Sequence, residues 1–414
     1  MKKNEGKKNT KSNVFWLGIV SLLADASSEM IAPVMPLFLS SVLGASGFMI
    51  GLIEGIAKSA ERLLSFVFGW YSDKIGKRKP VIAFGYFLSS IMKGAFAFTT
   101  VWTEFLFARV IERTGKAIRD APRDALLASS TGDSLEERRK GFALHRMLDT
   151  LGAIIGPLIA LLFVASLTLD FESTVRNLFI LSLIPGLLGV LIVLIFVKDV
   201  ELKKSERTKK SISKSFSIEY GDSYKQFLFS LVPFFLFAPP LAFIYLQASE
   251  FGLVLSGVIT LGFLYSVFYI LGANLINFAS DKFKMKIGRK QGIEISLLFV
   301  MLSFLVVFLV QYLQLDQGNA LTFIFLILAL VLYGIGMGMF EVESKSYISL
   351  LVEKKEMGGA FGAYQTISGV MIIFSGLIFG FIWDFSPGFA FLLAGISTFV
   401  SLFLFRFFTY TTVK

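Results

Sequence analysis

The side chains of this sequence that could do chemistry are ionisable residues embedded in long apolar stretches. They recur at spacings of three or four residues, which places them on one face of an α-helix. A charged group at the centre of a membrane helix costs roughly 2.5–3.5 kcal/mol on insertion scales, so such groups need a partner or a wet cavity. We expect a central network of ion pairs in which acids of the first two stretches meet cations of the fourth. The candidate residues are Asp25, Glu29, Glu54, Lys58, Glu61, Arg62, Arg109, Glu112, Arg113 and Lys116.

Asp25 and Glu29 are the best candidates to exchange a proton. The protonation of a carboxyl depends on its burial and on nearby cations, so movement of an Arg such as Arg109 could switch it. The alternative is a static network that only fixes helix packing. In the fifth stretch, His145 and Asp149 share the face that carries Gly152 and Gly156. A lone His near a membrane surface more often caps or packs than couples.

Several classes of chemistry are excluded or disfavoured by the residues that are missing. The chain has no Cys, which excludes disulfides, thiolate catalysis and Cys-ligated metals. No G-x-x-x-x-G-K-S/T loop occurs, so we do not expect ATP to drive it. We predict no cofactor, no metal and no enzymatic activity. A polytopic membrane enzyme that acts on lipid is the alternative from another class, and it would need catalytic residues clustered at one interface.

The elements that must position these side chains are membrane-spanning helices. Of the 414 residues, 55% are hydrophobic and 17% charged, and the mean hydropathy is +0.72. The apolar runs are long enough to cross a hydrocarbon core of about 30 Å. We predict an all-α membrane protein with twelve spans at 14–41, 48–71, 80–99, 104–129, 141–166, 177–197, 226–249, 253–278, 291–312, 320–350, 358–383 and 388–408.

The distribution of basic residues predicts the orientation of the chain. Nearly all loop Lys and Arg lie in alternate connecting segments, and the opposite set holds Arg176 alone. By the positive-inside rule both termini are cytoplasmic, in the cell membrane. The formal net charge of +10 is therefore a topology signal, and we predict no nucleic-acid partner. The fourth span carries eight charges between Arg109 and Asp124, and its alternative interpretation is a cytosolic amphipathic helix.

The chain is predicted to contain two halves of six helices. Segment 198–225 is the only long polar stretch, and we interpret it as a flexible cytoplasmic linker. The predicted parts are a cytoplasmic tail (1–13), a first bundle (14–197), the linker and a second bundle (226–414). Short segments of the first half recur in similar form at the corresponding positions of the second half. Such repeats are typical of transporters with a substrate site near the bilayer midplane.

A charged motif follows the second span, and a weaker copy follows the eighth. A carboxylate at the end of a helix can bind the N-terminus of a neighbouring helix or an Arg, which would act as a conformational latch. A simple basic turn is the alternative. The residues of the motif and its echo are Gly69, Asp73, Gly76, Lys77, Arg78 and, in the second half, Asp281.

This motif, G-x-x-S/A-D-x-x-G-R/K-R/K, resembles the hallmark loop of the major facilitator superfamily. The stretch from Arg109 to Gly115 is similar to a fourth-helix pattern of that family, with Glu112 in place of Gln. Gly152, Gly156 and Pro157 resemble a fifth-helix pattern of the drug/proton antiporter branch, although Ala160 departs from it. The resemblance implies two pseudo-symmetric six-helix bundles and transport by alternating access. Close helix packing is an equally good account of the two glycines.

The predicted spans of the second half contain few charged residues, and their polar side chains are mostly aromatic or uncharged. We predict a substrate cavity there, lined by Phe237, Tyr245, Gln247, Tyr269, Asn274, Tyr364 and Gln365. The predicted function is secondary active transport, with proton-coupled export of a small organic or amphiphilic compound. Proton symport or uniport uptake of a small solute is the alternative. The expected partners are the small-molecule substrate, protons and the lipid bilayer, and the chain is expected to be a monomer.

Overall fold

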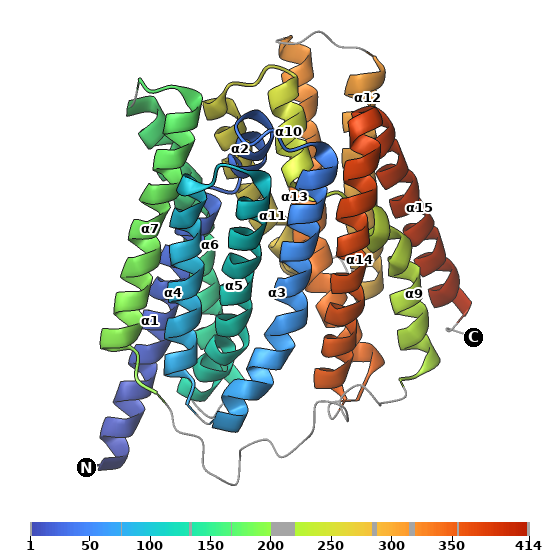
Figure 1. The fold of residues 1–414 in the computed structure, drawn as a ribbon. Helices are drawn as coiled ribbons and strands as arrows, with labels where there is room; N and C mark the ends of the chain where they lie inside the picture. The colour runs from blue at the N-terminus through green and yellow to red at the C-terminus, as the bar shows by residue number, and fades with distance from the viewer. Residues whose placement is uncertain are drawn as a thin grey trace. The chain divides into compact units, whose positions relative to one another are not determined.

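The structure is a computed structural model that describes residues 2–75, 77–131, 135–166, 168–199, 220–283, 288–313, 319–353 and 356–411. Within these ranges the regular structure is helical and no strand occurs (Figure 1). The predicted all-α fold is confirmed. Helix α1 begins at Lys2, so the predicted N-terminal tail continues directly into the first helix.

Each of the twelve predicted spans is occupied by helix. In the first half the elements are α1 (Lys2–Glu29), α2 (Met35–Ser41), α3 (Gly47–Ile75), α4 (Lys79–Ala95), the short 3-10 helix η1 (Phe96–Phe98), α5 (Trp102–Ser130), α6 (Leu135–Ser166) and α7 (Phe171–Phe196). In the second half they are α9 (Asp222–Phe237), α10 (Ala242–Glu250), α11 (Leu255–Phe283), α12 (Arg289–Tyr312), α13 (Ala320–Leu351), α14 (Met357–Phe385) and α15 (Pro387–Thr411).

Two predicted spans, the first and the seventh, are broken helices. Pro33 and Pro36 follow the end of α1, and Pro239 and Pro240 separate α9 from α10. Proline lacks the N–H that a continuing helix needs and disfavours helical geometry in the residue before it. Ala238, directly before the second pair, is accordingly extended, with φ −68° and ψ 117°.

Nine helices or helix pairs of the described chain are long and apolar enough to cross a membrane. They match the third, the fifth and all later predicted spans. The other three predicted spans, in α1, α3 and α5, are those that hold most of the candidate charges. A count of twelve spans therefore stays a prediction for these three helices.

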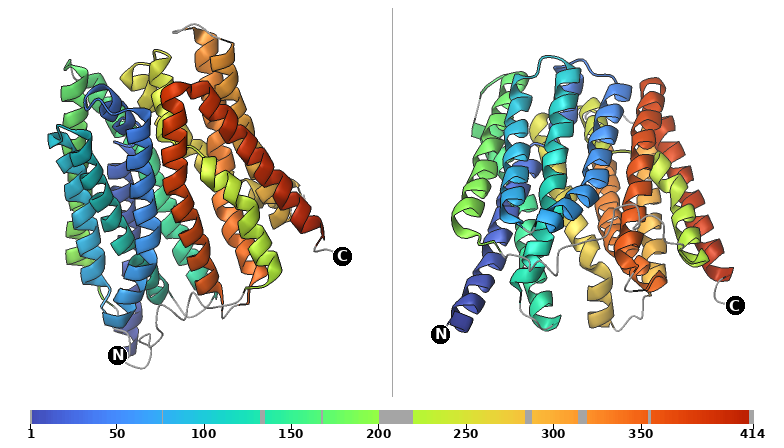
Figure 2. Two further views of the ribbon diagram at one scale, coloured as in Figure 1. Left: turned by 45° about the vertical axis from the view of Figure 1, so that its right-hand side comes forward. Right: turned by 60° about the horizontal axis from the view of Figure 1, so that its bottom comes forward.

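The helices group into two compact units. Unit 1 comprises Met1–Ala32 and Ala60–Ile212, and it contains α1, the end of α3, and α4 to α7. In this unit α1 packs against α6 and α7, and α4 packs against α5 and α7. Figure 2 shows these long helices running side by side over most of their length. This parallel packing brings side chains of α1, α3, α5 and α6 within reach of one another.

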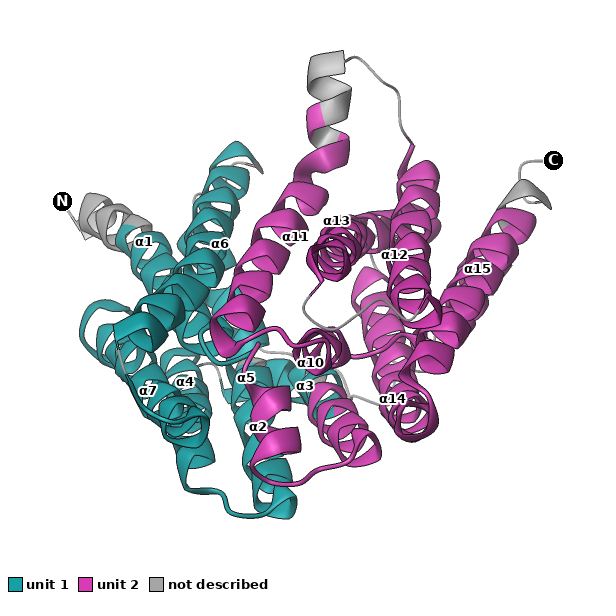
Figure 3. Cartoon of the chain, turned by 90° about the horizontal axis from the view of Figure 1, so that it is seen from above, with its two compact units in different colours: residues 1–32, 60–212 teal, residues 33–59, 213–414 magenta. Residues whose placement is uncertain are grey.

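Unit 2 comprises Pro33–Ser59 and Ser213–Lys414 (Figure 3). In it α12 packs against α13 and α15, α11 against α13, and α9 against α14 and α15. The start of α3 also belongs to this unit, so α3 contributes to both. The predicted division into residues 14–197 and 226–414 stays a prediction, and most of the predicted linker lies outside the described residues.

The start of α3 is held against α14 by backbone contact and by one carboxylate. A Cβ on Gly51 would lie 1.9 Å from the carbonyl oxygen of Gly376, so only glycine permits this approach. Asp384 of α14 accepts hydrogen bonds from the N–H groups of Gly47 (2.6 Å) and Phe48 (3.0 Å). These donors have no partner inside their own helix, and a carboxylate also suits the positive end of the helix dipole.

Candidate functional site

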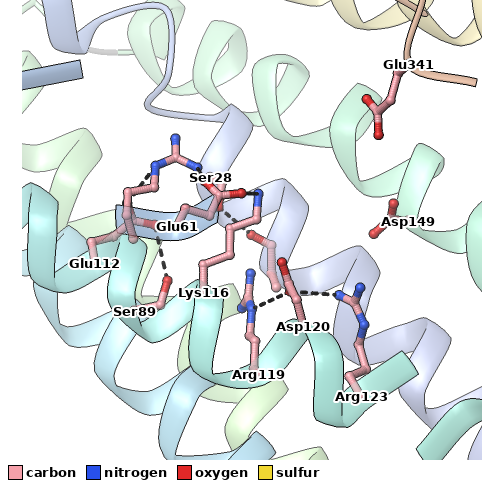
Figure 4. Close-up of polar contacts among 12 residues, drawn as sticks. Ser28, Glu61, Ser89, Glu112, Lys116, Arg119, Asp120, Arg123, Asp149 and Glu341 are labelled. Carbon is pink, nitrogen blue, oxygen red and sulfur yellow. Dashed lines mark hydrogen bonds and ion pairs between the residues drawn. The ribbon is translucent and has the colours of Figure 1, made fainter. Parts of the chain in front are cut away.

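The most concentrated set of charges in unit 1 surrounds helix α5. Glu61 on α3 accepts a hydrogen bond from Arg113 Nη1 of α5 at 2.9 Å, and Lys116 Nζ lies 3.5 Å from its other oxygen. Figure 4 shows Glu61 facing Lys116 across the two helices. The structure thus places an acid of the second span beside cations of the fourth. We call Glu61, Arg109, Glu112, Arg113 and Lys116 the α5 cluster.

Glu112 is the buried centre of this cluster. Its side chain is 2% exposed, and one oxygen contacts Arg109 Nη1 at 3.2 Å and Arg113 Nε at 3.3 Å. The other oxygen accepts a hydrogen bond from Ser89 of α4 at 3.2 Å (Figure 4). Arg109 is itself only 5% exposed. A buried guanidinium requires a counter-charge, which explains why a Glu rather than a Gln occupies this position.

The polar face of α5 continues toward its C-terminal end. Arg119 is buried, and its guanidinium carbon lies 4.1 Å from the centre of the Tyr86 ring. Asp120 lies 3.6 Å from Arg119 Nε and 3.4 Å from Arg123 Nη1 (Figure 4). A cation over an aromatic face is stabilised even where water is excluded. The 3.6-residue helical period therefore gives α5 one continuous charged face.

Asp149 of α6, to which the sequence assigned no role, contacts α1. It accepts a hydrogen bond from Ser21 of α1 at 2.5 Å and lies 3.5 Å from Arg146. Ser21 lies about one helical turn before Asp25 on α1. The predicted exchange of a proton at Asp25 stays a prediction.

The single network of all the predicted charges stays a prediction. Glu54 and Lys58 lie on the part of α3 that belongs to unit 2, whereas Glu61 and Arg62 lie on the part in unit 1. One terminal nitrogen of Arg62 is buried without a hydrogen-bond partner among the described residues. Glu29 lies at the last residue of α1, one helical turn beyond Asp25.

Lys93 of α4 is a buried cation that the sequence analysis missed. Only 1% of it is exposed, and its Nζ donates hydrogen bonds to Ser27 Oγ at 3.0 Å and to the Ala24 carbonyl at 3.4 Å, both on α1. It is the one charged residue inside the predicted third span, so the sequence alone could have identified it as a buried functional candidate. His145 is buried too, and its Nε2 has no hydrogen-bond partner in the described part of the chain.

The predicted latch is described only in part. Gly76 and the side chains of Asp73 and Asp281 lie outside the described residues. Arg78 is buried, and its Nη1 donates hydrogen bonds to the Ala125 carbonyl (2.9 Å) and to Ser129 Oγ (3.2 Å) near the end of α5. Lys77 is exposed, and Gly69 packs against Ala121 of α5. Arg78, at the basic end of the motif, therefore binds the start of α4 to the C-terminal part of α5, the helix that contains most of the α5 cluster.

The first residue of α12 forms a comparable contact. Arg289 Nη1 lies 3.0 Å from Glu343 of α13, whose side chain is 3% exposed. Elsewhere on α13, Glu341 accepts a hydrogen bond from the Tyr269 hydroxyl and pairs with Lys345 at 2.9 Å. Two of the few acids of unit 2 are thus paired among the described residues.

The cavity lined by the seven predicted residues stays a prediction, and the structure places them on α9, α10, α11 and α14. Tyr364 packs edge-on against Phe235, while Tyr245 and Gln247 are buried in α10. Asn274 is exposed, and its amide donates to the Ile270 carbonyl. The other members, Phe237 and Gln365, are half-buried on α9 and α14, and Tyr269 contacts Glu341 as described. No group of three metal-binding side chains occurs among the described residues.

Nearly the whole chain matches a known protein family. The model of the Major Facilitator Superfamily matches residues 17–313 and 226–414. The chain belongs to this superfamily. It is therefore a membrane transporter of small molecules that works by secondary active transport.

Named relatives and solved structures agree with this assignment. The chain is 32% identical over 409 residues to the uncharacterized MFS-type transporter MJ1317 of Methanocaldococcus jannaschii, covering 97% of this chain and 96% of the relative. It is 28% identical over 148 residues to the multidrug resistance protein MdtH of Photorhabdus laumondii, about a third of each chain (35%). A mutant form of the nucleoside transporter NupG superimposes with a TM-score of 0.77 at 15% identity, covering 95% of this chain and 99% of NupG. A POT family transporter superimposes with a TM-score of 0.76 at 15% identity, over 97% of this chain and 96% of that structure. At this identity the two structures show the shared fold alone.

Proposed function

We propose that this transporter exchanges protons for a small organic or amphiphilic compound, which it exports by alternating access. It would act in the cell membrane, with both termini in the cytoplasm. The observation that carries the proposal is the α5 cluster, in which buried and accessible charges are linked. Arg109 and Glu112 are almost fully buried, whereas Glu61, Arg113 and Lys116 keep 13%, 17% and 28% of their side chains exposed.

The geometry of the cluster favours exchange of partners over a purely static role. Arg113 contacts two carboxylates at once, Glu61 at 2.9 Å and Glu112 at 3.3 Å. Glu61 in turn contacts two cations, since Lys116 lies 3.5 Å away. A change of charge on one member therefore alters the strength of several contacts. A transporter needs such a linkage to couple a proton to the conformation of the binding site.

The proposed substrate class is supported by composition and by one relative. The chain contains 46 Phe and 12 Tyr, and rings such as Phe235, Phe340 and Tyr364 pack together in unit 2. Aromatic surfaces bind apolar and amphiphilic ligands. The similarity to a protein named for multidrug resistance points in the same direction, although it covers only about a third of the chain.

The test is transport by the purified protein in liposomes. A thermal-stabilisation screen over organic cations, anions and neutral amphiphiles selects a transported compound, with ethidium as the first probe. The compound is then placed on one side and a pH gradient is imposed. Antiport predicts accumulation against the compound's gradient on the acidic side. Accumulation on the alkaline side would instead establish symport, and flux indifferent to pH would refute proton coupling.

A matched control keeps this test specific. Glu172→Gln removes a carboxylate that is 51% exposed and paired with Arg176 at the start of α7, away from the α5 cluster. This variant should transport like the wild type. Glu61→Gln should lose accumulation driven by the pH gradient while still inserting into the membrane.

A further inference from the structure

A lysine without a counter-ion lies between helices α1 and α4 in unit 1. Only 1% of Lys93 is exposed, and no acid lies within ion-pairing distance of its Nζ in the described part of the chain. Its Nζ contacts two oxygens of α1, Ser27 Oγ at 3.0 Å and the Ala24 carbonyl at 3.4 Å. We propose that Lys93 is an uncharged amine in this conformation and that it is the site at which the transporter takes up its coupled proton. This inference rests on the proposed proton coupling and names the residue that carries the proton.

The hydrogen bonds of Lys93 fit an amine better than an ammonium. Ser27 donates its own hydroxyl hydrogen to the Ser182 carbonyl of α7 at 2.7 Å, because a carbonyl oxygen can only accept. Ser27 Oγ and the Ala24 carbonyl are therefore both acceptors toward Nζ. An uncharged amine has two N–H groups, and these two acceptors satisfy both. A charged ammonium has three N–H groups, and the third would have no acceptor among the described residues.

The lack of a counter-ion is the second argument for an uncharged Lys93. A buried charge is tolerated when an opposite charge and hydrogen bonds compensate it. Arg109 shows this arrangement in the same unit, because Glu112 lies 3.2 Å from its Nη1. Lys93 has no such partner in the described structure, and lysine can release its proton when buried, whereas arginine stays charged in proteins. The residue type therefore suits a site that is sometimes charged and sometimes neutral.

Small residues on three helices close this site to water. A Cβ on Gly186 of α7 would lie 2.5 Å from Ser90 Oγ of α4 and 3.4 Å from Ser27 Oγ of α1, so α7 approaches both helices closely. Proton exchange with water therefore requires another conformation, in which α1 and α4 separate at Lys93. Coupled transport needs a proton site that is closed in one conformation and open in another, because a permanently open site would let protons leak across the membrane.

The charged groups around Lys93 come from α1 and α5. The groups with the strongest electrostatic influence on it are two acids and two cations, namely Glu112, Asp25, Arg119 and Lys116. Among the other elements packed against α4, η1 has no charged residue, and those of α7, Glu172 and Arg176, lie at its N-terminal end. On α4 itself, Tyr86 lies about two turns before Lys93 and packs against Arg119. Acids and cations are equal in number around Lys93, so no surplus of negative charge holds a proton on it.

Ser89 connects the position of Lys93 to the α5 cluster. It lies about one turn before Lys93 on α4 and donates a hydrogen bond of 3.2 Å to Glu112 (Figure 4). When a proton arrives from water, an O–H bond of hydronium breaks and the lone pair of Nζ forms a third N–H bond. The new positive charge attracts Glu112 and repels Arg113, which contacts both Glu112 and Glu61. Protonation thereby shifts Arg113 toward Glu61 and strengthens the contact between α3 and α5, and release of the proton reverses this change.

Nuclear magnetic resonance tests the uncharged amine without any substrate. The full-length protein is labelled with carbon-13 at the Cε atoms of lysine and placed in lipid nanodiscs, because the Cε shift distinguishes an amine from an ammonium. At about pH 8, where exposed lysines remain charged, we expect one signal of a neutral lysine. Acidification should convert this signal to that of an ammonium.

Two lysine variants assign the signal. Lys93→Met should lose it, whereas Lys140→Met should retain it, because Lys140 is 74% exposed and paired with Glu136 at the start of α6. A wild-type spectrum with charged lysines alone would overturn the proposal. A neutral signal that persists in Lys93→Met, or that does not change on acidification, would overturn it as well.

A variant that keeps Lys93 protects the test against misfolding. Ser27→Ala removes one of the two acceptors of Lys93, so the neutral signal should remain at a changed Cε shift. An unchanged shift would show that the neutral lysine is not Lys93.

Flux of the screened compound separates this inference from the proposed function. In a pH gradient, Lys93→Met and Lys93→Arg should both equilibrate the compound without accumulating it, because methionine cannot bind a proton and arginine does not release one. Lys140→Met should accumulate the compound like the wild type. Wild-type flux that ignores a pH gradient refutes proton coupling itself, whereas accumulation that survives in Lys93→Met refutes only the assignment to Lys93.

Discussion

Glu112→Gln is predicted to be among the most destabilising isosteric substitutions in unit 1. The carboxylate is 2% exposed and neutralises Arg109, which is 5% exposed. The amide keeps the shape of the side chain and can still accept from Ser89, so the change removes mainly the charge. Breaking a buried ion pair by removing one partner costs about 3–5 kcal/mol, because the other charge stays buried without compensation.

The matched comparison is Glu61→Gln in the same cluster. Its carboxylate is 13% exposed, and its partners Arg113 and Lys116 are 17% and 28% exposed. Because water screens these charges, we expect a loss of about 1 kcal/mol or less. With a shift of about 2–4 °C per kcal/mol for a unit of this size, Glu112→Gln should lower the melting temperature by roughly 6–20 °C. Glu61→Gln should lower it by about 4 °C or less.

Intrinsic tryptophan fluorescence in detergent is a suitable assay. Trp16 of α1 stacks on Phe196 of α7 with ring centres 4.2 Å apart, so it reports on the packing of unit 1. The double variant Arg109→Gln/Glu112→Gln removes both charges and should recover about 1–3 kcal/mol relative to the sum of the single losses. Equal melting temperatures for the two single Glu variants, or strictly additive losses in the double variant, would refute the account of a buried charge pair.

Three further predictions concern helix contacts and topology. Gly152→Ala should lower stability by about 1–3 kcal/mol, measured by the same melting assay, because its Cβ would collide with the backbone of α1; an unchanged melting temperature would contradict the close approach. Asp384→Asn should cost about 0.3–1 kcal/mol by removing the negative charge at the first turn of α3, and Asp384→Glu should retain part of that stability; equal loss in both would argue against a charge at the helix end. In this Cys-free chain, Glu136→Cys should react with a membrane-impermeant thiol reagent only from the cytoplasmic side, and Glu172→Cys only from outside; labelling of both from one side would refute the predicted orientation.

The helices were largely predictable, because their signals are local. The apolar runs located helix at all twelve predicted positions, and the prolines that break the first and seventh spans were visible in the chain. The charged face of α5 also followed from spacing, since the helical period is fixed by backbone geometry. The contact of Glu61 with Arg113 and Lys116 required only that acids and cations lie at similar depths.

What the sequence did not reveal depends on the register between helices. Asp149 received no role from the sequence, whereas the structure places it in hydrogen-bonding contact with Ser21 of α1. The register between α1 and α6 is set by backbone contacts at Gly152 and Gly156, which no single helix encodes. The seven predicted cavity residues stay a prediction. Residue type identifies an aromatic or polar side chain, but its direction depends on the neighbouring helices.

The central claim is that carboxyl groups of unit 1 couple transport to protons. The most direct measurement is accumulation of the screened compound in proteoliposomes, driven by a pH gradient alone, in the wild type and in Glu61→Gln. The account predicts accumulation against the concentration gradient by the wild type. It also predicts that Glu61→Gln equilibrates the compound without accumulating it. Accumulation by Glu61→Gln at the wild-type level would contradict the account.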